Sequence, residues 1–73
     1  MNKEEFLNEL KIAINTDNEL NENTILNDIA EWDSLAVMCT VTLFAEQLNT
    51  PITFEEIKNL KTIKDLINKA KIK

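Results

Sequence analysis

The chain has 73 residues and a net charge of −5 at pH 7, and it contains no His, no Gly and a single Cys. A chain of this length forms one small domain, residues 1–73, without room for a deep catalytic cleft. Its composition lacks the groups for His-based acid–base chemistry, thiolate–His pairs, zinc sites and phosphate-binding glycine loops. We therefore expect neither an enzyme nor a metal site.

The distribution of charge and apolar residues also limits the partners and the compartment. Residues 1–57 carry 12 acids and two lysines, whereas residues 58–73 carry six lysines and one aspartate. The acidic bulk disfavours nucleic acid, and the lysines suit either a solvated last helix or an electrostatic docking patch. No apolar run approaches the ~18 residues of a membrane span, no signal-peptide core is present, and one Cys cannot form an internal disulfide. We expect a cytoplasmic protein.

The first predicted element is a helix over residues 3–14. Asn2 is its expected N-cap, and Glu5 follows three residues later, as in a capping box. The apolar residues of one helical face are Phe6, Leu7, Leu10, Ala13 and Ile14. A long polar loop over residues 15–32 follows, with a short helical turn possible at residues 24–29. We interpret its apolar residues as core that anchors the loop: Leu20, Ile25, Leu26, Ile29 and Trp32.

A second helix is predicted from Ser34 to Leu48, with Asp33 or Ser34 as its N-cap. No charged residue occurs between Asp33 and Glu46, so this helix is apolar nearly all round. Its β-branched residues also permit a strand, but the length and the lack of alternation favour a helix. The stripe expected to pack on the first and last helices is Met38, Val41, Phe44, Ala45 and Leu48. Five residues have no clear place: Ala36, Cys39, Leu43, Thr40 and Thr42.

Two short helices complete the predicted fold. Pro51 ends the second helix, and Thr53 with Glu56 forms a capping box that starts the third. Thr62 with Asp65 starts the fourth helix in the same way. Ile52 and Ile57 have the spacing of a hydrophobic staple, and the apolar face of the last helix is Ile63, Leu66, Ile67 and Ala70. The predicted fold class is all-α, a small four-helix bundle with a long loop between its first two helices.

The segment Asp33-Ser34-Leu35 is the candidate functional site. A serine at a helix start has its hydroxyl outside the helix body, so it is an N-cap and nothing more, or it is an attachment point. The order of helix, anchored loop, Asp-Ser-Leu, apolar helix and two short helices resembles the acyl carrier protein family over the whole chain. Trp32 before the motif is similar to carriers written Trp-Asp-Ser-Leu. This resemblance predicts an acyl-carrier-protein-like fold.

The resemblance also implies a function for Ser34. In that family a 4′-phosphopantetheine arm is attached to the motif serine through a phosphodiester, with Asp33 and Leu35 as the flanking motif residues. A phosphopantetheinyl transferase would donate the arm from coenzyme A. The arm would then carry acyl or aminoacyl groups as thioesters to loading and transfer enzymes, so that Ser34 is a modified residue and not a catalyst.

One departure from the family concerns the partners. Fatty-acid carriers place acids along the helix after the serine, but the matching positions here are Ala36, Cys39 and Ala45, and only Glu46 is charged. This pattern favours a dedicated pathway that uses aminoacyl, peptide, polyketide or specialised acyl carriers. The expected partner-binding residues are Ala36, Met38, Cys39, Thr42 and Glu46, with docking dominated by apolar burial. The alternative hypothesis is an unmodified helical module that binds a partner through the same helix. We expect a monomer in either case.

Overall fold

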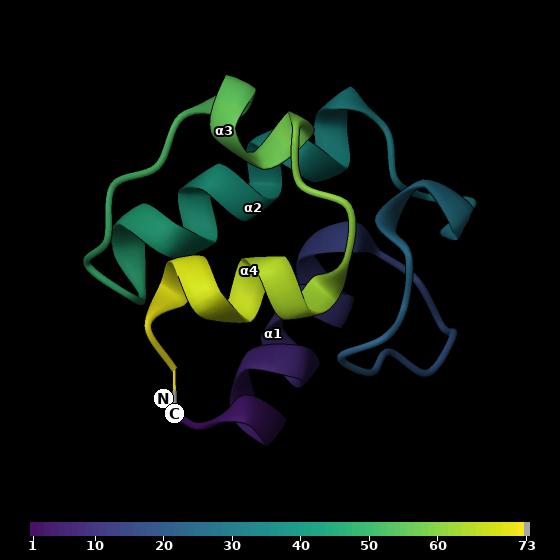
Figure 1. Cartoon of the computed structure of the whole chain (residues 1–73), viewed down its shortest axis with the longest axis horizontal. Helices are drawn as coiled ribbons and strands as arrows, with labels where there is room; N and C mark the ends of the chain where they lie inside the picture. The colour runs from purple at the N-terminus through teal and green to yellow at the C-terminus, as the bar shows by residue number, and fades with distance from the viewer. Residues whose placement is uncertain (73) are drawn as a thin grey trace.

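The computed structural model describes residues 1–72 as a bundle of four α-helices and one short 3₁₀ helix (Figure 1). The described residues form no strand, so the predicted all-α fold class is confirmed. None of the helices in this part of the chain is long and apolar enough to cross a membrane. In chain order the elements are α1 (Lys3–Ile14), η1 (Leu26–Asp28), α2 (Ser34–Glu46), α3 (Phe54–Lys58) and α4 (Ile63–Ala70).

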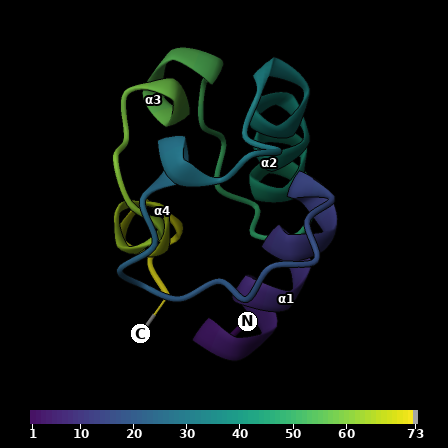
Figure 2. The same cartoon turned by 90° about the vertical axis from the view of Figure 1, so that its right-hand side faces the viewer.

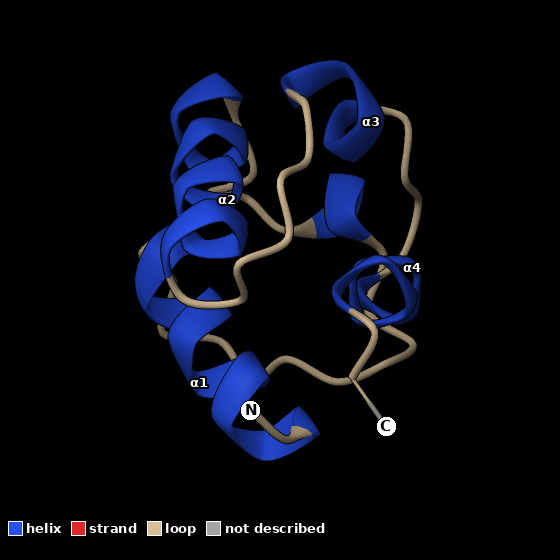
Figure 3. Ribbon diagram, turned by 90° about the vertical axis from the view of Figure 1, so that its left-hand side faces the viewer, coloured by secondary structure: helices blue, strands red, loops and turns tan. Residues whose placement is uncertain are grey.

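The helices form two sides around one core. Two views from opposite directions show α1 and α2 on one side of the molecule and α3 and α4 on the other (Figures 2 and 3). The rings of Phe6 in α1 and Phe44 in α2 meet edge to face, with centroids 5.9 Å apart and planes at 83°. Both rings are fully buried, so this aromatic pair joins the first two helices at the centre of the core.

The helices start where the sequence predicts, but within the described residues α1 has the Asn2 cap without the reciprocal Glu5 bond of a capping box. The Asn2 side chain accepts a hydrogen bond from the Glu5 backbone N–H at 2.8 Å, which caps α1. Thr53 with Glu56 forms a complete capping box at α3, and Thr62 with Asp65 forms one at α4. Each box pairs backbone N–H groups that a helix start otherwise leaves without a partner.

The loop between α1 and α2 is anchored by backbone hydrogen bonds to the segment that leads into α4. The Leu26 N–H donates to the Lys61 carbonyl at 2.8 Å, and the Ile63 N–H donates to the Thr24 carbonyl at 3.0 Å. Because these bonds use polar groups of both segments, the long loop is fixed without secondary structure of its own beyond η1. The prediction of an anchored loop is confirmed.

The apolar residues of this loop divide between core and surface. Leu20, Leu26 and Ile29 are buried as predicted, and Trp32 is half-buried against the core. Ile25 is 48% exposed, so its prediction as core is wrong. Its backbone is extended and forms an isolated antiparallel bridge with Thr62. Neighbouring residues of an extended segment point in opposite directions, and here it is Leu26 that faces the core.

The orientation of α2 differs from the prediction. The buried residues of this helix are Ala36, Val37, Thr40, Leu43 and Phe44. Met38 is 50% exposed and Ala45 is exposed, so the prediction is wrong for these two residues of the stripe, whereas Phe44 is buried and Val41 and Leu48 are partly buried against the core. Because α2 contacts α1 and also α3, its buried face lies between those two helices and not along a narrow line. The helix also ends at Glu46, two residues before the predicted end.

Thr40 shows how this helix tolerates a polar residue in its core. Its side chain is fully buried, and its hydroxyl donates to the carbonyl of Ala36 at 2.8 Å. A Thr hydroxyl satisfied by the preceding turn of its own helix can be buried at little cost. The polarity of a threonine is therefore a poor guide to which side of an apolar helix faces solvent.

Candidate functional site

The candidate site begins at the first residue of α2. Asp33 is the N-cap, with an extended backbone, and its Oδ1 accepts a hydrogen bond from the Ala36 N–H at 2.9 Å. Of the two N-cap candidates, Asp33 is therefore the one used. Ser34 is exposed at the first helical position, so its hydroxyl is not needed for capping and lies at the protein surface.

The backbone on both sides of Ser34 is held by neighbouring turns. Before it, the Trp32 N–H donates to the carbonyl of Ile29 at 3.0 Å, and the Trp32 ring packs against the core. After it, the Val37 N–H donates to the carbonyl of Asp33 at 3.0 Å, which begins the helical hydrogen bonding. The serine therefore lies between an anchored turn and the first turn of a core helix, which fixes its position relative to the bundle.

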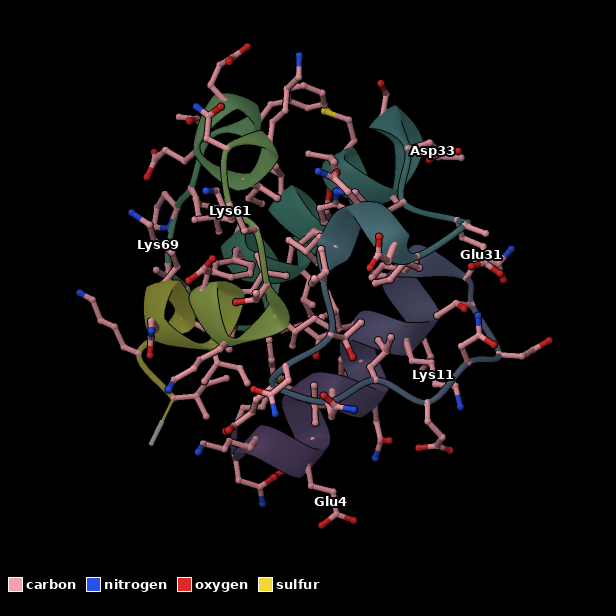
Figure 4. The ribbon with its side chains drawn as sticks, turned by 45° about the vertical axis from the view of Figure 1, so that its right-hand side comes forward. Glu4, Lys11, Glu31, Asp33, Lys61 and Lys69 are labelled. Atoms are coloured by element: carbon pink, nitrogen blue, oxygen red, sulfur yellow. The ribbon has the colours of Figure 1, made fainter. Side chains whose placement is uncertain are left out.

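The surroundings of Ser34 are acidic on one side. Figure 4 shows Glu31 and Asp33 on the same side of the molecule, near the start of α2. Glu31 is partly buried, and its Oε1 is buried without a hydrogen-bond partner within the described residues. Both carboxylates line a surface recess of about 370 Å³ that also includes Leu35, the neighbour of Ser34. The N-terminal dipole of α2 offsets part of this negative potential.

The predicted partner-binding residues occupy different depths. Met38, Thr42 and Glu46 are exposed, and Cys39 is half-buried. Ala36 is only 3% exposed and packs in the core, but it also lines the recess near Leu35, so its role as a partner contact stays a prediction. The helix turns Ala36 toward the interior because it lies one turn before Thr40, on the face that the other helices cover.

Two exposed apolar side chains stand out beside these residues. Leu35 is 71% exposed in α2, and Ile12 is 72% exposed in α1. Sequence reasoning placed Leu35 in the motif but did not use Ile12. The spacing of apolar residues in α1 would have predicted that Ile12 is exposed, since it falls outside the i, i+3, i+4 stripe that buries Phe6, Leu10 and Ile14. An isoleucine on the polar side of an amphipathic helix adds exposed apolar area to the protein surface.

Ile12 lies where two surface recesses between α1 and α2 adjoin. The recess near Leu35 and a second one of about 230 Å³ toward the end of α2 share three lining residues, Ile12, Ala13 and Cys39. We call the two together the α1–α2 groove. Besides the shared residues, the side chains that matter below are Glu9, Glu31, Asp33, Leu35, Thr42, Glu46 and Gln47.

Comparisons of the chain with protein-family models, with curated proteins and with solved structures find no match. Within residues 1–72, no group of three or more His, Cys, Asp or Glu side chains is arranged to hold a metal ion. The features of this surface that bear on function are the exposed serine, its acidic surroundings and the apolar groove beside it.

Proposed function

We propose that the chain is a carrier protein that holds a 4′-phosphopantetheine arm on Ser34. The observation that carries the proposal is that Ser34 is exposed at the first position of a core helix. Asp33 caps this helix, so the Ser34 hydroxyl is not needed as a cap. An attachment residue must be accessible to a modifying enzyme and must not be required for folding. Ser34 meets both conditions.

The residues around Ser34 leave it accessible to a phosphopantetheine group, and the charges near it affect how well the phosphodiester is tolerated. A phosphodiester anion on the serine is favoured by the free N–H groups and the dipole at the start of α2. The Asp33 carboxylate opposes it, but this carboxylate is already hydrogen-bonded to the backbone of Ala36. When bound, the arm supplies a thiol that carries acyl or aminoacyl groups.

The protein's own residues do no bond-breaking chemistry in this proposal. Asp33 fixes the start of the helix, Trp32 holds the preceding turn against the core, and Leu35 offers an apolar contact beside the attachment point. A separate phosphopantetheinyl transferase attaches the arm from coenzyme A, and loading and transfer enzymes act on its cargo. The tether raises the effective concentration of the cargo at those enzymes. We place the carrier in the cytoplasm, as a monomer.

The few charges on the exposed face of α2 favour partners from a dedicated pathway. Cys39 and Ala45 stand where fatty-acid carriers have acids, and Glu46 is the one charged residue of this helix. Aminoacyl, peptide, polyketide or specialised acyl-transfer enzymes are therefore the proposed loading and transfer partners.

The test is co-expression with a broad-specificity phosphopantetheinyl transferase, followed by intact mass measurement. We expect the mass to rise by one phosphopantetheine and the modified peptide to contain Ser34, which is the only serine in the chain. The Ser34→Ala variant stays unmodified and remains helical by circular dichroism. A matched control is Thr50→Ala, because Thr50 carries a hydroxyl after the end of α2 and outside the α1–α2 groove, and it keeps the full mass shift.

A second candidate function is an unmodified interaction module. The observation that favours it is the exposure of Leu35 and Met38, at 71% and 50%, one turn apart on α2. Wild-type protein that stays unmodified with several transferases would reject the carrier proposal and leave the interaction module.

A further inference from the structure

We propose that the α1–α2 groove is a docking surface for an amphipathic helix of a partner protein, with apolar side chains on one face and Lys or Arg along its edges. The inference follows from three features of the groove. These are its exposed apolar side chains, its unpaired acidic rim and its length along α2.

The apolar part of the groove is formed by both helices. Ile12 from α1 and Leu35 from α2 are more than two-thirds exposed, and Ala13 and Cys39 lie between the two recesses. Exposed apolar side chains that lie together on the surface of a small domain mark a site that a partner can cover.

The rim of the groove is acidic at both ends. Glu31 and Asp33 line it near the start of α2, and Glu9 and Glu46 line it near the end. Within residues 1–72 the Glu9 side chain has a neutral hydrogen-bond partner, since Gln47 Nε2 donates to Glu9 Oε2 at 3.3 Å. Within the described residues, no lysine lines either recess.

Among the described residues, no lysine forms an ion pair with a carboxylate of the groove. The three ion pairs among the described residues join Lys3 to Glu22, Lys11 to Glu19 and Lys69 to Glu56, and none uses a carboxylate of the groove. Figure 4 shows Lys61 and Lys69 across the molecule from Glu31 and Asp33. The four groove carboxylates are therefore left for cations that a partner supplies.

The dimensions of the groove suit a helix of the partner. From Leu35 to Glu46 the groove follows α2 for about three turns, or roughly 16 Å at 1.5 Å per residue. A partner helix of similar length presents apolar residues at i, i+3, i+4 and i+7 to Ile12, Leu35 and Cys39. Its Lys or Arg residues beside that stripe then reach the acids at the rim.

The inference rests on the proposed function for the kind of partner, namely the enzymes that modify, load and unload Ser34. Its physical basis does not require the arm, because the groove is formed by the unmodified chain. Docking and modification can therefore be measured separately on the same protein.

The probe for the docking test is a synthetic 14-residue amphipathic helix of Leu and Lys with blocked ends, titrated into the ¹⁵N-labelled full chain. We expect saturable binding with the largest amide shifts in residues 9–13 and 35–46. A peptide with every Lys replaced by Glu binds at least about tenfold more weakly, because it repels the acidic rim.

Matched variants separate the groove from the rest of the surface. Ile12→Ala weakens binding about tenfold, because it removes apolar area from the groove, whereas Ile25→Ala, at an exposed isoleucine outside it, leaves the affinity unchanged. Glu46→Gln weakens binding about threefold at low salt and less at high salt. The control Glu19→Gln removes an exposed loop charge outside the groove and has no comparable effect.

Several outcomes would overturn the docking proposal. These are the absence of saturable binding, shifts gathered on α3 and α4, or an Ile12→Ala variant that binds as tightly as wild type. A dimer of the chain alone in sedimentation, dissociated by Ile12→Ala, would assign the groove to a second copy. The mass shift on Ser34 is measured on the same variants, so failure of docking with intact modification is distinguished from failure of the carrier proposal.

Discussion

The two helices α4 and α2 differ in how far their sequences specify which side is buried. In α4 the four apolar residues predicted to face the core are all buried, and the charged residues between them lie toward solvent. Of the five residues in the stripe predicted for α2, Phe44 is buried, Val41 and Leu48 are partly buried, and Met38 and Ala45 are exposed. A helix that carries both polar and apolar residues specifies its own orientation, and one that is nearly all apolar does not.

The difference has a simple physical origin. Each lysine and aspartate of α4 would lose its hydration in the core, so only one rotation of that helix is acceptable. Rotating α2 exchanges one apolar side chain for another, and the free-energy difference between rotations is then set by shape. The face of α2 that is buried in the bundle with α1 and α3 combines small and large side chains, namely Ala36, Val37, Thr40, Leu43 and Phe44.

The largest expected effect tests the observed orientation of α2. Phe44→Ala is expected to destabilise the protein by ~3–5 kcal/mol, because the ring is fully buried against Phe6. That is most of the stability of a small domain, so partial unfolding is expected at 25 °C. Met38 belongs to the same predicted stripe but is half exposed, so Met38→Ala should change the free energy of unfolding by less than ~1 kcal/mol. Urea denaturation measures both, and equal losses in the two variants would favour the predicted stripe over the observed one.

A smaller effect is expected at the turn that leads into α2. Trp32→Ala is expected to cost ~2 kcal/mol, because the half-buried ring packs on the core but loses less contact than a fully buried ring. Thermal melts followed by circular dichroism give the loss, with Leu35→Ala as the exposed control on the other side of Ser34. Melting temperatures that coincide for wild type and Trp32→Ala would show that the ring is a surface feature and that α2 is positioned without it.

The smallest effect concerns the start of α4 and depends on pH. The Asp65 carboxylate accepts backbone hydrogen bonds from Lys61 and Thr62, and these bonds hold the pKa of Asp65 below its ordinary value. The folded protein therefore binds this proton more weakly than the unfolded chain. The resulting stabilisation is complete above the unfolded pKa of about 3.9 and is lost as the pH falls through the folded pKa.

The variant Asp65→Asn isolates this contribution. We expect it to be less stable than wild type at pH 7, and the difference to shrink in acid as the wild-type carboxylate becomes protonated. Urea denaturation of both proteins between pH 7 and pH 2 measures the difference. A gap that stays constant over this range would mean that the ionised carboxylate does not stabilise the start of α4.

The candidate site was predictable in its position but not in its extent. Asp33, Ser34 and Leu35 are identifiable from the motif and from its place at a helix start. Ala36 was assigned to the partner surface and is buried, since an apolar helix does not mark its exposed side. Ile12 was not assigned at all, because it belongs to another helix and joins the surface only when α1 packs beside α2.

The sequence by itself determined where the helices of this protein begin and which side of α1 and α4 is buried. Caps, capping boxes and amphipathic spacing involve residues a few positions apart, so these signals can be read without knowing which distant segments come into contact. Only the tertiary structure decided the rotation of α2, the exposure of Ile25 and the groove between α1 and α2. Each of these depends on contacts between distant segments, such as the hydrogen bonds from the loop to residues 61–63 and the packing of Phe6 on Phe44. The free energy of such contacts depends on complementary shape, which local patterns do not encode.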